Sequence, residues 1–171
     1  MIQYLNEDEV YRVGMCIEQA GLDFYTKMAA KADEPQTKRT FQRLAKDEKA
    51  HLAFFESLEI KTAGGMGAGP ADQDADLSRY VCSIVDGGIF RSLSQMEKLG
   101  RMKFDPESAL ELALQVEKDA VLYYSEAHRA NKKRAAREAL ERLIEEEKGH
   151  VVQISKRLEA LRKQKSRGEG K

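Results

Sequence analysis

Two Glu-x-x-His units occur in this chain, and each pairs a carboxylate with an imidazole. The first is Glu48 and His51, in the segment DEKAH, and the second is Glu147 and His150, in EEKGH. Residues three apart lie on the same face of a helix, so each unit can present two metal ligands side by side. Oxygen and imidazole ligands without thiolate suit iron or manganese, and zinc is an alternative.

Further residues repeat at the offset of 99 positions that separates the two units. Glu18 aligns with Glu117 and Tyr25 with Tyr124, while RLAKDEKAH aligns with RLIEEEKGH. Few of the fifty aligned positions are identical, and the identities concentrate at residues able to bind metal and at their neighbours. The repeat therefore indicates more than a shared helical composition.

Long helices must position these residues. Charged residues make up 34% of the sequence, which has no Trp and only three Pro, and apolar residues recur at helical spacing. We expect four helices: from the cap Asn6 to the segment KADEP at 31–35, from Pro35 to about 61, from the cap Asp105 to about 130, and from about 133 to 163.

The spacing places the ligand candidates at the same height in each predicted hairpin. Glu18 and Glu48 each lie about 15 residues from a turn near residue 33, and Glu117 and Glu147 lie about as far from a turn near 132. A lone Glu-x-x-His is usually solvated surface, but these residues fall among apolar positions, where buried charges must be paired or coordinated. Four carboxylates neutralise the charge of two divalent cations. One Glu from each of two helices and a Glu-x-x-His unit from each of the other two is the di-metal ligand arrangement of helix bundles.

The chain resembles the ferritin-like superfamily and, within it, the di-iron domain of rubrerythrin. The resemblance covers about residues 6–155 and rests on the helix pattern, on E-x6-Y at Glu18/Tyr25 and Glu117/Tyr124, and on DEKAH and EEKGH. It implies an all-α, ferritin-like four-helix bundle with a long crossover between helices two and three.

The resemblance also implies a role for each repeated residue. Glu48 and Glu147 would bridge two metal ions. The other four would complete the two ligand sets, Glu18 and His51 on one ion and Glu117 and His150 on the other. The implied cofactor is two iron ions, with manganese or zinc as alternatives.

The resemblance also leads to expectations for four further residues beside the ligands. Tyr25 and Tyr124 would donate hydrogen bonds to ligand carboxylates across the bundle, with a half-buried core position as the alternative. Rubrerythrins usually carry an extra Glu where this chain has Ala120, whose repeat partner is Gly21. We therefore expect no exchange between that Glu and a His, and we expect space beside the metals for O2 or peroxide.

The implied function is redox chemistry on hydrogen peroxide or O2, as a peroxidase or oxidase. Because no rubredoxin domain is visible, an external donor would supply the electrons. Two alternatives stay open: a ferroxidase that handles or stores iron, and a bundle with structural metals that acts as a binding module. The insertion over 61–105 would encumber a storage cage, so storage ranks lower.

Net charge and composition limit the expected binding partners and cellular location. Lys and Arg total 29, as do Asp and Glu, so the net charge gives no indication of nucleic-acid or membrane binding. No secretory signal or apolar run of ~20 residues is visible. Cys16 and Cys82 stand alone, which excludes a disulfide framework and favours a reducing, cytoplasmic setting.

The length of the link between helices two and three predicts the topology. We expect one domain over residues 1–163, a crossover with a helical segment over 61–105, and a disordered tail over 164–171. Bundle turns take ~2–8 residues, so this link is long enough to travel the length of the bundle and to make helices two and three parallel. The alternative is that 76–101 packs on a second chain, and a homodimer is the expected assembly.

Overall fold

The computed structural model describes residues 7–63, 104–130 and 134–168, and it places them in an all-α bundle of the ferritin-like type. The helices are α1 (Glu7–Lys31), α2 (Pro35–Ala63), α5 (Pro106–Ala130) and α6 (Arg134–Gly168). The predicted cap Asn6 and the predicted helical segment of the crossover lie outside the described residues. None of the described helices has the length of apolar sequence that a membrane span requires.

Helix α5 begins as the sequence predicted, at Pro106 behind the cap Asp105. The Asp105 carboxylate accepts hydrogen bonds from the Ser108 backbone N–H at 2.9 Å and from the Ser108 hydroxyl at 2.6 Å. Its backbone carbonyl accepts from the Ala109 N–H at 3.0 Å. Proline fits the first helical position because its missing N–H would have no partner there.

Helix α6 continues to Gly168, five residues past the predicted end at 163, so the prediction of a disordered tail was wrong for residues 164–168. Its last turns are held by contacts that the local sequence does not reveal. Arg162 and Lys165 reach Glu107 of α5 at 2.7 and 2.6 Å. Basic residues near a helix C-terminus also interact favourably with the helix dipole.

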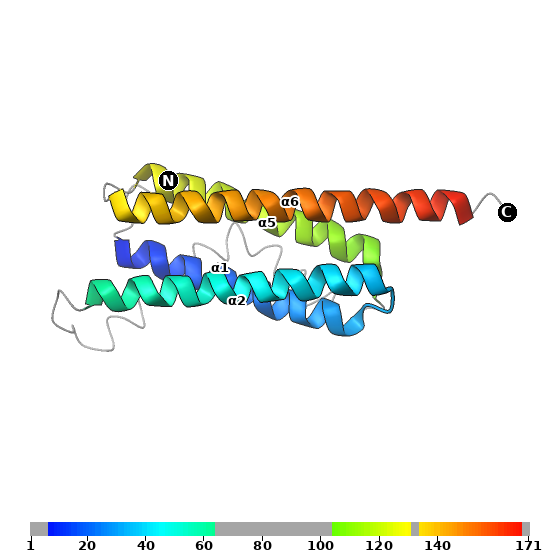
Figure 1. Ribbon diagram of the computed structural model, residues 1–171, viewed down its shortest axis with the longest axis horizontal. Helices are drawn as coiled ribbons and strands as arrows, with labels where there is room; N and C mark the ends of the chain where they lie inside the picture. The colour runs from blue at the N-terminus through cyan, green and yellow to red at the C-terminus, as the bar shows by residue number, and fades with distance from the viewer. Residues whose placement is uncertain (1–6, 64–103, 131–133, 169–171) are drawn as a thin grey trace.

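The helices form two antiparallel hairpins, α1 with α2 and α5 with α6, and most helix–helix contacts lie within each hairpin. In Figure 1, α1 and α6 run from left to right, whereas α2 and α5 run from right to left. The prediction that helices two and three are parallel is therefore confirmed. The end of α2 and the start of α5 lie at opposite ends of the bundle, and the link between them must join these ends.

The core consists of two apolar clusters separated by a polar layer. The Phe55 cluster comprises Tyr11, Val13, Ile17, Phe55, Ala120, Tyr123, Tyr124, Ala127, Ala136, Leu140, Leu143 and Ile144. The Phe41 cluster comprises Phe24, Tyr25, Met28, Ala29, Phe41, Leu44, Ala109, Leu110, Ala113, Val116, Ile154, Leu158 and Leu161. Along every helix, one cluster ends before the predicted metal ligands and the other begins after them. The polar layer is thus closed off by apolar packing at both ends.

Candidate metal centre

Each of the four described helices contributes a carboxylate to the polar layer. Helices α1 and α5 bring Glu18 and Glu117, while α2 and α6 each bring a Glu and a His. All six side chains are buried: Glu18, Glu48, His51, Glu117, Glu147 and His150. Their positions follow from the antiparallel hairpins, which bring residues equally distant from a turn to the same height.

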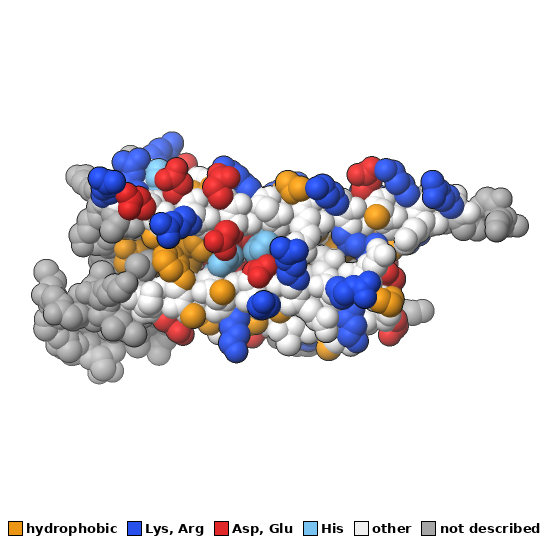
Figure 2. Space-filling view, viewed as in Figure 1, with side chains coloured by type: hydrophobic (Ala, Val, Ile, Leu, Met, Phe, Trp, Pro, Cys, Tyr) orange, Lys and Arg blue, Asp and Glu red, His pale blue; other side chains and the backbone are white. Residues whose placement is uncertain are grey.

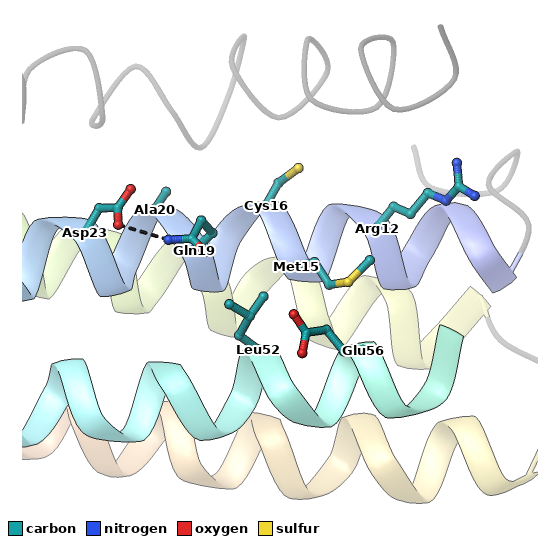
Figure 3. A pocket seen from close by; sticks show the side chains of 8 residues that line it. All are labelled: Arg12, Met15, Cys16, Gln19, Ala20, Asp23, Leu52 and Glu56. Atoms are coloured by element: carbon teal, nitrogen blue, oxygen red, sulfur yellow. Dashed lines mark hydrogen bonds between the residues drawn. The ribbon is translucent and has the colours of Figure 1, made fainter. Parts of the chain in front are cut away.

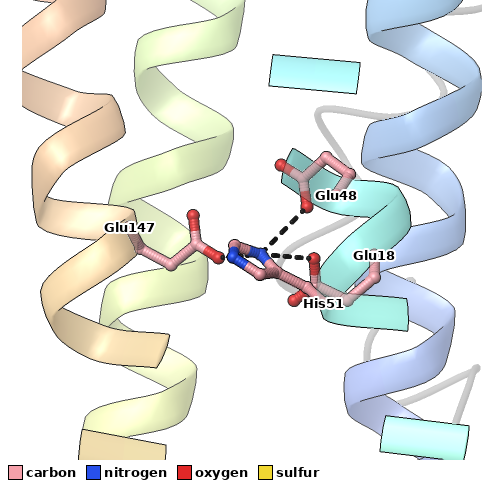
Figure 4. A group of neighbouring side chains, drawn as sticks. All are labelled: Glu18, Glu48, His51 and Glu147. Atoms are coloured by element: carbon pink, nitrogen blue, oxygen red, sulfur yellow. Dashed lines mark hydrogen bonds and ion pairs between the residues drawn. The ribbon is translucent and has the colours of Figure 1, made fainter. Parts of the chain in front are cut away.

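The six side chains form two overlapping groups, each with ligand atoms within 4.8 Å of one another. The first group is Glu18, Glu48, His51 and Glu147, and Figure 4 shows it converging from three helices. The second group is Glu48, Glu117, Glu147 and His150. Glu48 and Glu147 belong to both groups, so each could contact two ions at once.

Both imidazoles turn their Nδ1 atoms toward the carboxylates. Nδ1 of His51 lies 3.0 Å from Glu147 Oε1, 3.3 Å from Glu18 Oε2 and 3.7 Å from Glu48 Oε2. For the other imidazole, Nδ1 of His150 lies 2.9 Å from Glu147 Oε2 and 3.4 Å from an oxygen of Glu117. The two rings stack with their centroids 5.7 Å apart.

The opposite ring nitrogens face two acidic side chains that the sequence interpretation missed. Nε2 of His51 lies 2.8 Å from Glu146 Oε2, and Nε2 of His150 lies 3.4 Å from Asp47 Oδ2. Figure 2 shows imidazole atoms at the surface of the seam between α2 and α6, beside acidic side chains. A signal was present, because Asp47 and Glu146 also align at the offset of 99 residues.

Two tyrosines reach across the bundle to the remaining carboxylates. The Tyr25 hydroxyl donates to Glu117 Oε1, and the Tyr124 hydroxyl donates to Glu18 Oε1. Both tyrosines are completely buried. Burial, followed by the nearby carboxylates, raises the pKa of both phenols, so they stay neutral and act as donors.

A sequence model of the rubrerythrin family matches residues 1–59. The matched part of the chain is therefore similar to the di-iron domain of rubrerythrin. The match covers α1 and most of α2, and with them Glu18, Glu48 and His51. The matched hairpin, α1 with α2, is called the rubrerythrin-like hairpin below. The second hairpin, α5 with α6, is related to it by the sequence repeat and contributes residues to both ligand groups. No curated protein and no solved structure matches the chain.

Beside the candidate ligands, Gly21 and Ala120 were expected to leave open space, and the structure differs from this expectation. A Cβ atom added at Gly21 would lie 3.2 Å from Glu48 Cδ, so the carboxylate of Glu48 fills the room that this glycine leaves. Ala120 is buried in the Phe55 cluster. The expected space for O2 or peroxide is therefore not open at Gly21.

A surface pocket of about 520 Å³ lies on the outer side of the rubrerythrin-like hairpin (Figure 3). Gln19 and Leu52 line it, directly after Glu18 and His51 in the sequence. In Figure 3 the half-buried thiol of Cys16 points away from α2. Because the ligand side chains point into the bundle, this pocket is separate from the metal-binding atoms.

Burial and mutual repulsion shift the pKa values of carboxylates in the polar layer. Burial and then the neighbouring Glu18 raise the pKa of Glu48, and burial and then Glu147 raise the pKa of Glu117 to about 8. Burial also raises the pKa of Glu147, but the hydrogen bond from His150 and the close imidazole of His51 outweigh it, and the net shift is downward. Without cations, the cluster must therefore hold protons to offset its carboxylates.

One carboxylate oxygen fits coordination better than hydrogen bonding. Glu147 Oε1 is buried, and no group among the described residues donates a well-directed hydrogen bond to it. It lies 3.0 Å from His51 Nδ1 without the angle of a hydrogen bond. Buried polar atoms are normally satisfied, and a cation beside this oxygen would satisfy it. The residues of the polar layer thus fit a metal centre in both charge and ligand type.

Proposed function

We propose that this protein is a rubrerythrin-like di-iron protein that carries out redox chemistry on hydrogen peroxide or O2. The observation that supports the proposal most is the sharing of Glu48 and Glu147 between two groups of metal-binding atoms. Carboxylates shared in this way would hold two ions close enough together for both to contact one small oxidant. When bound, two Fe(II) ions supply the two electrons that convert one hydrogen peroxide and two protons into two waters.

In this proposal, the buried residues belong to the ligand sets of two different ions. Glu18 and His51 would complete the ligands of one ion, and Glu117 and His150 would complete those of the other. Manganese and zinc suit the same atoms, so the proposal names iron on the strength of the rubrerythrin-like sequence. An external electron donor, a homodimer and a cytoplasmic location belong to the same proposal.

The tyrosines and the apolar clusters prepare the site. Each tyrosine engages one oxygen of a carboxylate, Glu117 or Glu18, which leaves the other oxygen toward the ligand group. Such partners fix the orientation of a ligand before the metal arrives. The clusters on either side exclude water, which strengthens the electrostatic interactions within the layer.

Anaerobic iron loading followed by peroxide tests the proposal. We expect two Fe(II) ions per chain, and one equivalent of hydrogen peroxide should oxidise both, as followed by the near-ultraviolet absorption of ferric iron. Added reductant should then restore Fe(II) and allow further turnover. Protein that binds one tight metal ion or none would overturn the proposal.

The same experiment separates the two alternative functions. Continued uptake of Fe(II) with growth of a mineral would indicate iron storage by a ferroxidase. Two bound ions that do not react with peroxide or O2 would indicate structural metals in a binding module. Sedimentation analysis of the loaded protein would test the proposed homodimer.

A further inference from the structure

Asp47 and Glu146 occupy matching places on the two hairpins and contact each other's histidines. Asp47 precedes Glu48 on α2 and faces His150, whereas Glu146 precedes Glu147 on α6 and faces His51. The two contacts are therefore crossed, because each acidic residue meets the imidazole of the opposite hairpin. Neither carboxylate belongs to the two groups of metal-binding atoms.

A carboxylate beside Nε2 has a definite effect on a ligating imidazole. It accepts the Nε2–H, so the neutral ring carries its proton there and its lone pair at Nδ1. In both histidines Nδ1 is the atom that faces the buried carboxylates. In Figure 4 the ring of His51 extends from α2 toward Glu147, with Glu48 and Glu18 on its other side. The outer contact thus supports the orientation and tautomer that metal binding requires.

The two outer contacts are unequal. The contact from Glu146 to His51 is 2.8 Å long, a normal hydrogen-bond length, whereas the 3.4 Å contact from Asp47 to His150 is at the outer limit. Asp47 Oδ2 also lies 3.7 Å from Arg43 Nε, which competes for the same oxygen. Glu146 is more exposed than Asp47, but its imidazole partner is buried, so water reaches only the outer end of that pair.

We infer that Asp47 and Glu146 are positioning residues of the metal centre, and that Glu146 orients His51 more firmly than Asp47 orients His150. The inference rests on the proposed di-metal function and extends it, because it makes the two metal positions inequivalent. The ion held by His51 depends strongly on Glu146, and the ion held by His150 depends weakly on Asp47.

Cobalt(II) binding to the metal-free protein tests this inference. The variants are Glu146→Leu and Asp47→Leu, which remove the acceptor, and Glu146→Gln and Asp47→Asn, which keep an uncharged acceptor. The matched control is Glu145→Leu, because Glu145 is exposed and pairs with Lys148 on its own helix. The measurements are the affinity and stoichiometry of Co(II) and the proton NMR signals of the imidazole N–H groups, which bound Co(II) shifts away from the other signals.

We expect the unchanged protein to bind two Co(II) and to show one slowly exchanging, shifted N–H signal for each histidine. Glu146→Leu should weaken one of the two ions by about 10- to 100-fold and make one N–H signal exchange rapidly. Asp47→Leu should weaken the other ion by less than about 10-fold. Glu146→Gln should restore most of the affinity, and Glu145→Leu should change nothing.

Every other result would contradict a particular part of the inference or of the proposed function. Unchanged affinity and exchange in Glu146→Leu would overturn the inference and leave the di-metal centre standing. Equal losses in the two Leu variants would overturn the inequality, and a Gln variant as weak as the Leu variant would overturn positioning by hydrogen bonding. Fewer than two Co(II) in the unchanged protein would overturn the proposed centre itself. Circular dichroism of every variant checks the fold, and Glu146→Ala replaces a Leu variant that does not fold.

Discussion

The buried carboxylates differ in how many ions each can reach. Glu48 lies in both groups of metal-binding atoms, whereas Glu18 lies in one. The same side-chain type therefore has two different degrees of importance, depending only on its position in the layer. Because Glu48 and Glu147 come from different hairpins, an ion bound to both would also join the two halves of the bundle.

Substitution of a shared carboxylate should remove both ions. We expect Glu48→Ala to retain no tightly bound metal, because both ligand sets lose a member, and Glu18→Ala to retain one ion. Metal analysis after dialysis of reconstituted protein measures the difference, with the exposed Glu145→Ala as control. Two ions retained in Glu48→Ala would show that this carboxylate is not shared.

A glycine beside the same carboxylate gives a second prediction at this scale. In Gly21→Ala the new Cβ would lie 3.2 Å from Glu48 Cδ, so the carboxylate must move and affinity for both ions should fall. Gly149→Ala is the control, because nothing lies within 4 Å of its added Cβ. Replacing a helical glycine without a clash stabilises by about 0.5–1 kcal/mol, so urea unfolding should show a gain for Gly149→Ala alone.

At the scale of the elements, Arg157 links α6 to the beginning of α2. The Glu34 carboxylate caps α2 by accepting the N–H groups of Thr37 and Gln36 at 2.7 and 3.1 Å. The guanidinium of Arg157 pairs with Glu34 and donates to the Thr37 hydroxyl at 3.1 Å and to the Gln36 amide oxygen at 3.0 Å. One buried arginine thus satisfies the polar groups of a helix start on the other hairpin.

This link should weaken in acid. Burial raises the pKa of Glu34, but hydrogen bonds from Thr37 and Gln36 and then the charge of Arg157 together outweigh it and lower the pKa overall. A lowered carboxyl pKa gives stability that is present above the ordinary value near ~4.5 and is lost as the pH falls through the lower, folded-state value. Glu34→Gln should therefore lose less stability than the unchanged protein between pH 5 and 3, measured by thermal unfolding of the metal-free forms at ~0.1 M salt. An equal acid loss in both would contradict this role.

The helices themselves could be predicted well, because apolar periodicity and the Asp105–Pro106 start are local signals. The parallel course of α2 and α5 also followed, since a link of that length is far longer than a bundle turn needs. The true end of α6 could not be predicted, because Arg162 and Lys165 are stabilised by Glu107 on another helix. Asp47 and Glu146 were missed because acidic residues on charged helices usually face only solvent.

At the scale of the whole molecule, metal ions would act as a link between hairpins. Most helix contacts lie within each hairpin, and both ligand groups combine residues of the two hairpins. A ligand that binds only the folded state stabilises it by about 2.7 kcal/mol at a free concentration of 100 times its Kd. We therefore expect chelation to lower the melting temperature and added Fe(II) or Zn(II) to raise it.

Calorimetric scans at several metal concentrations measure this dependence. The stabilisation should be largest for the unchanged protein, smaller for Glu18→Ala and nearly absent for Glu48→Ala. A melting temperature that does not respond to metal in the unchanged protein would mean that the folded and unfolded chains bind the ions equally.

The division of ligands between hairpins also sets the moment at which the centre can first exist during synthesis. A ribosome that has made α1 and α2 has supplied Glu18, Glu48 and His51, but each group still lacks a member from α6. At about 5–20 residues per second, the 99 residues from His51 to His150 take roughly 5–20 s to add. Throughout that interval the nascent chain has no complete cage. The proposed centre could therefore bind its full set of ions only after translation has passed His150, and metal delivery would be a maturation step separate from the making of the chain.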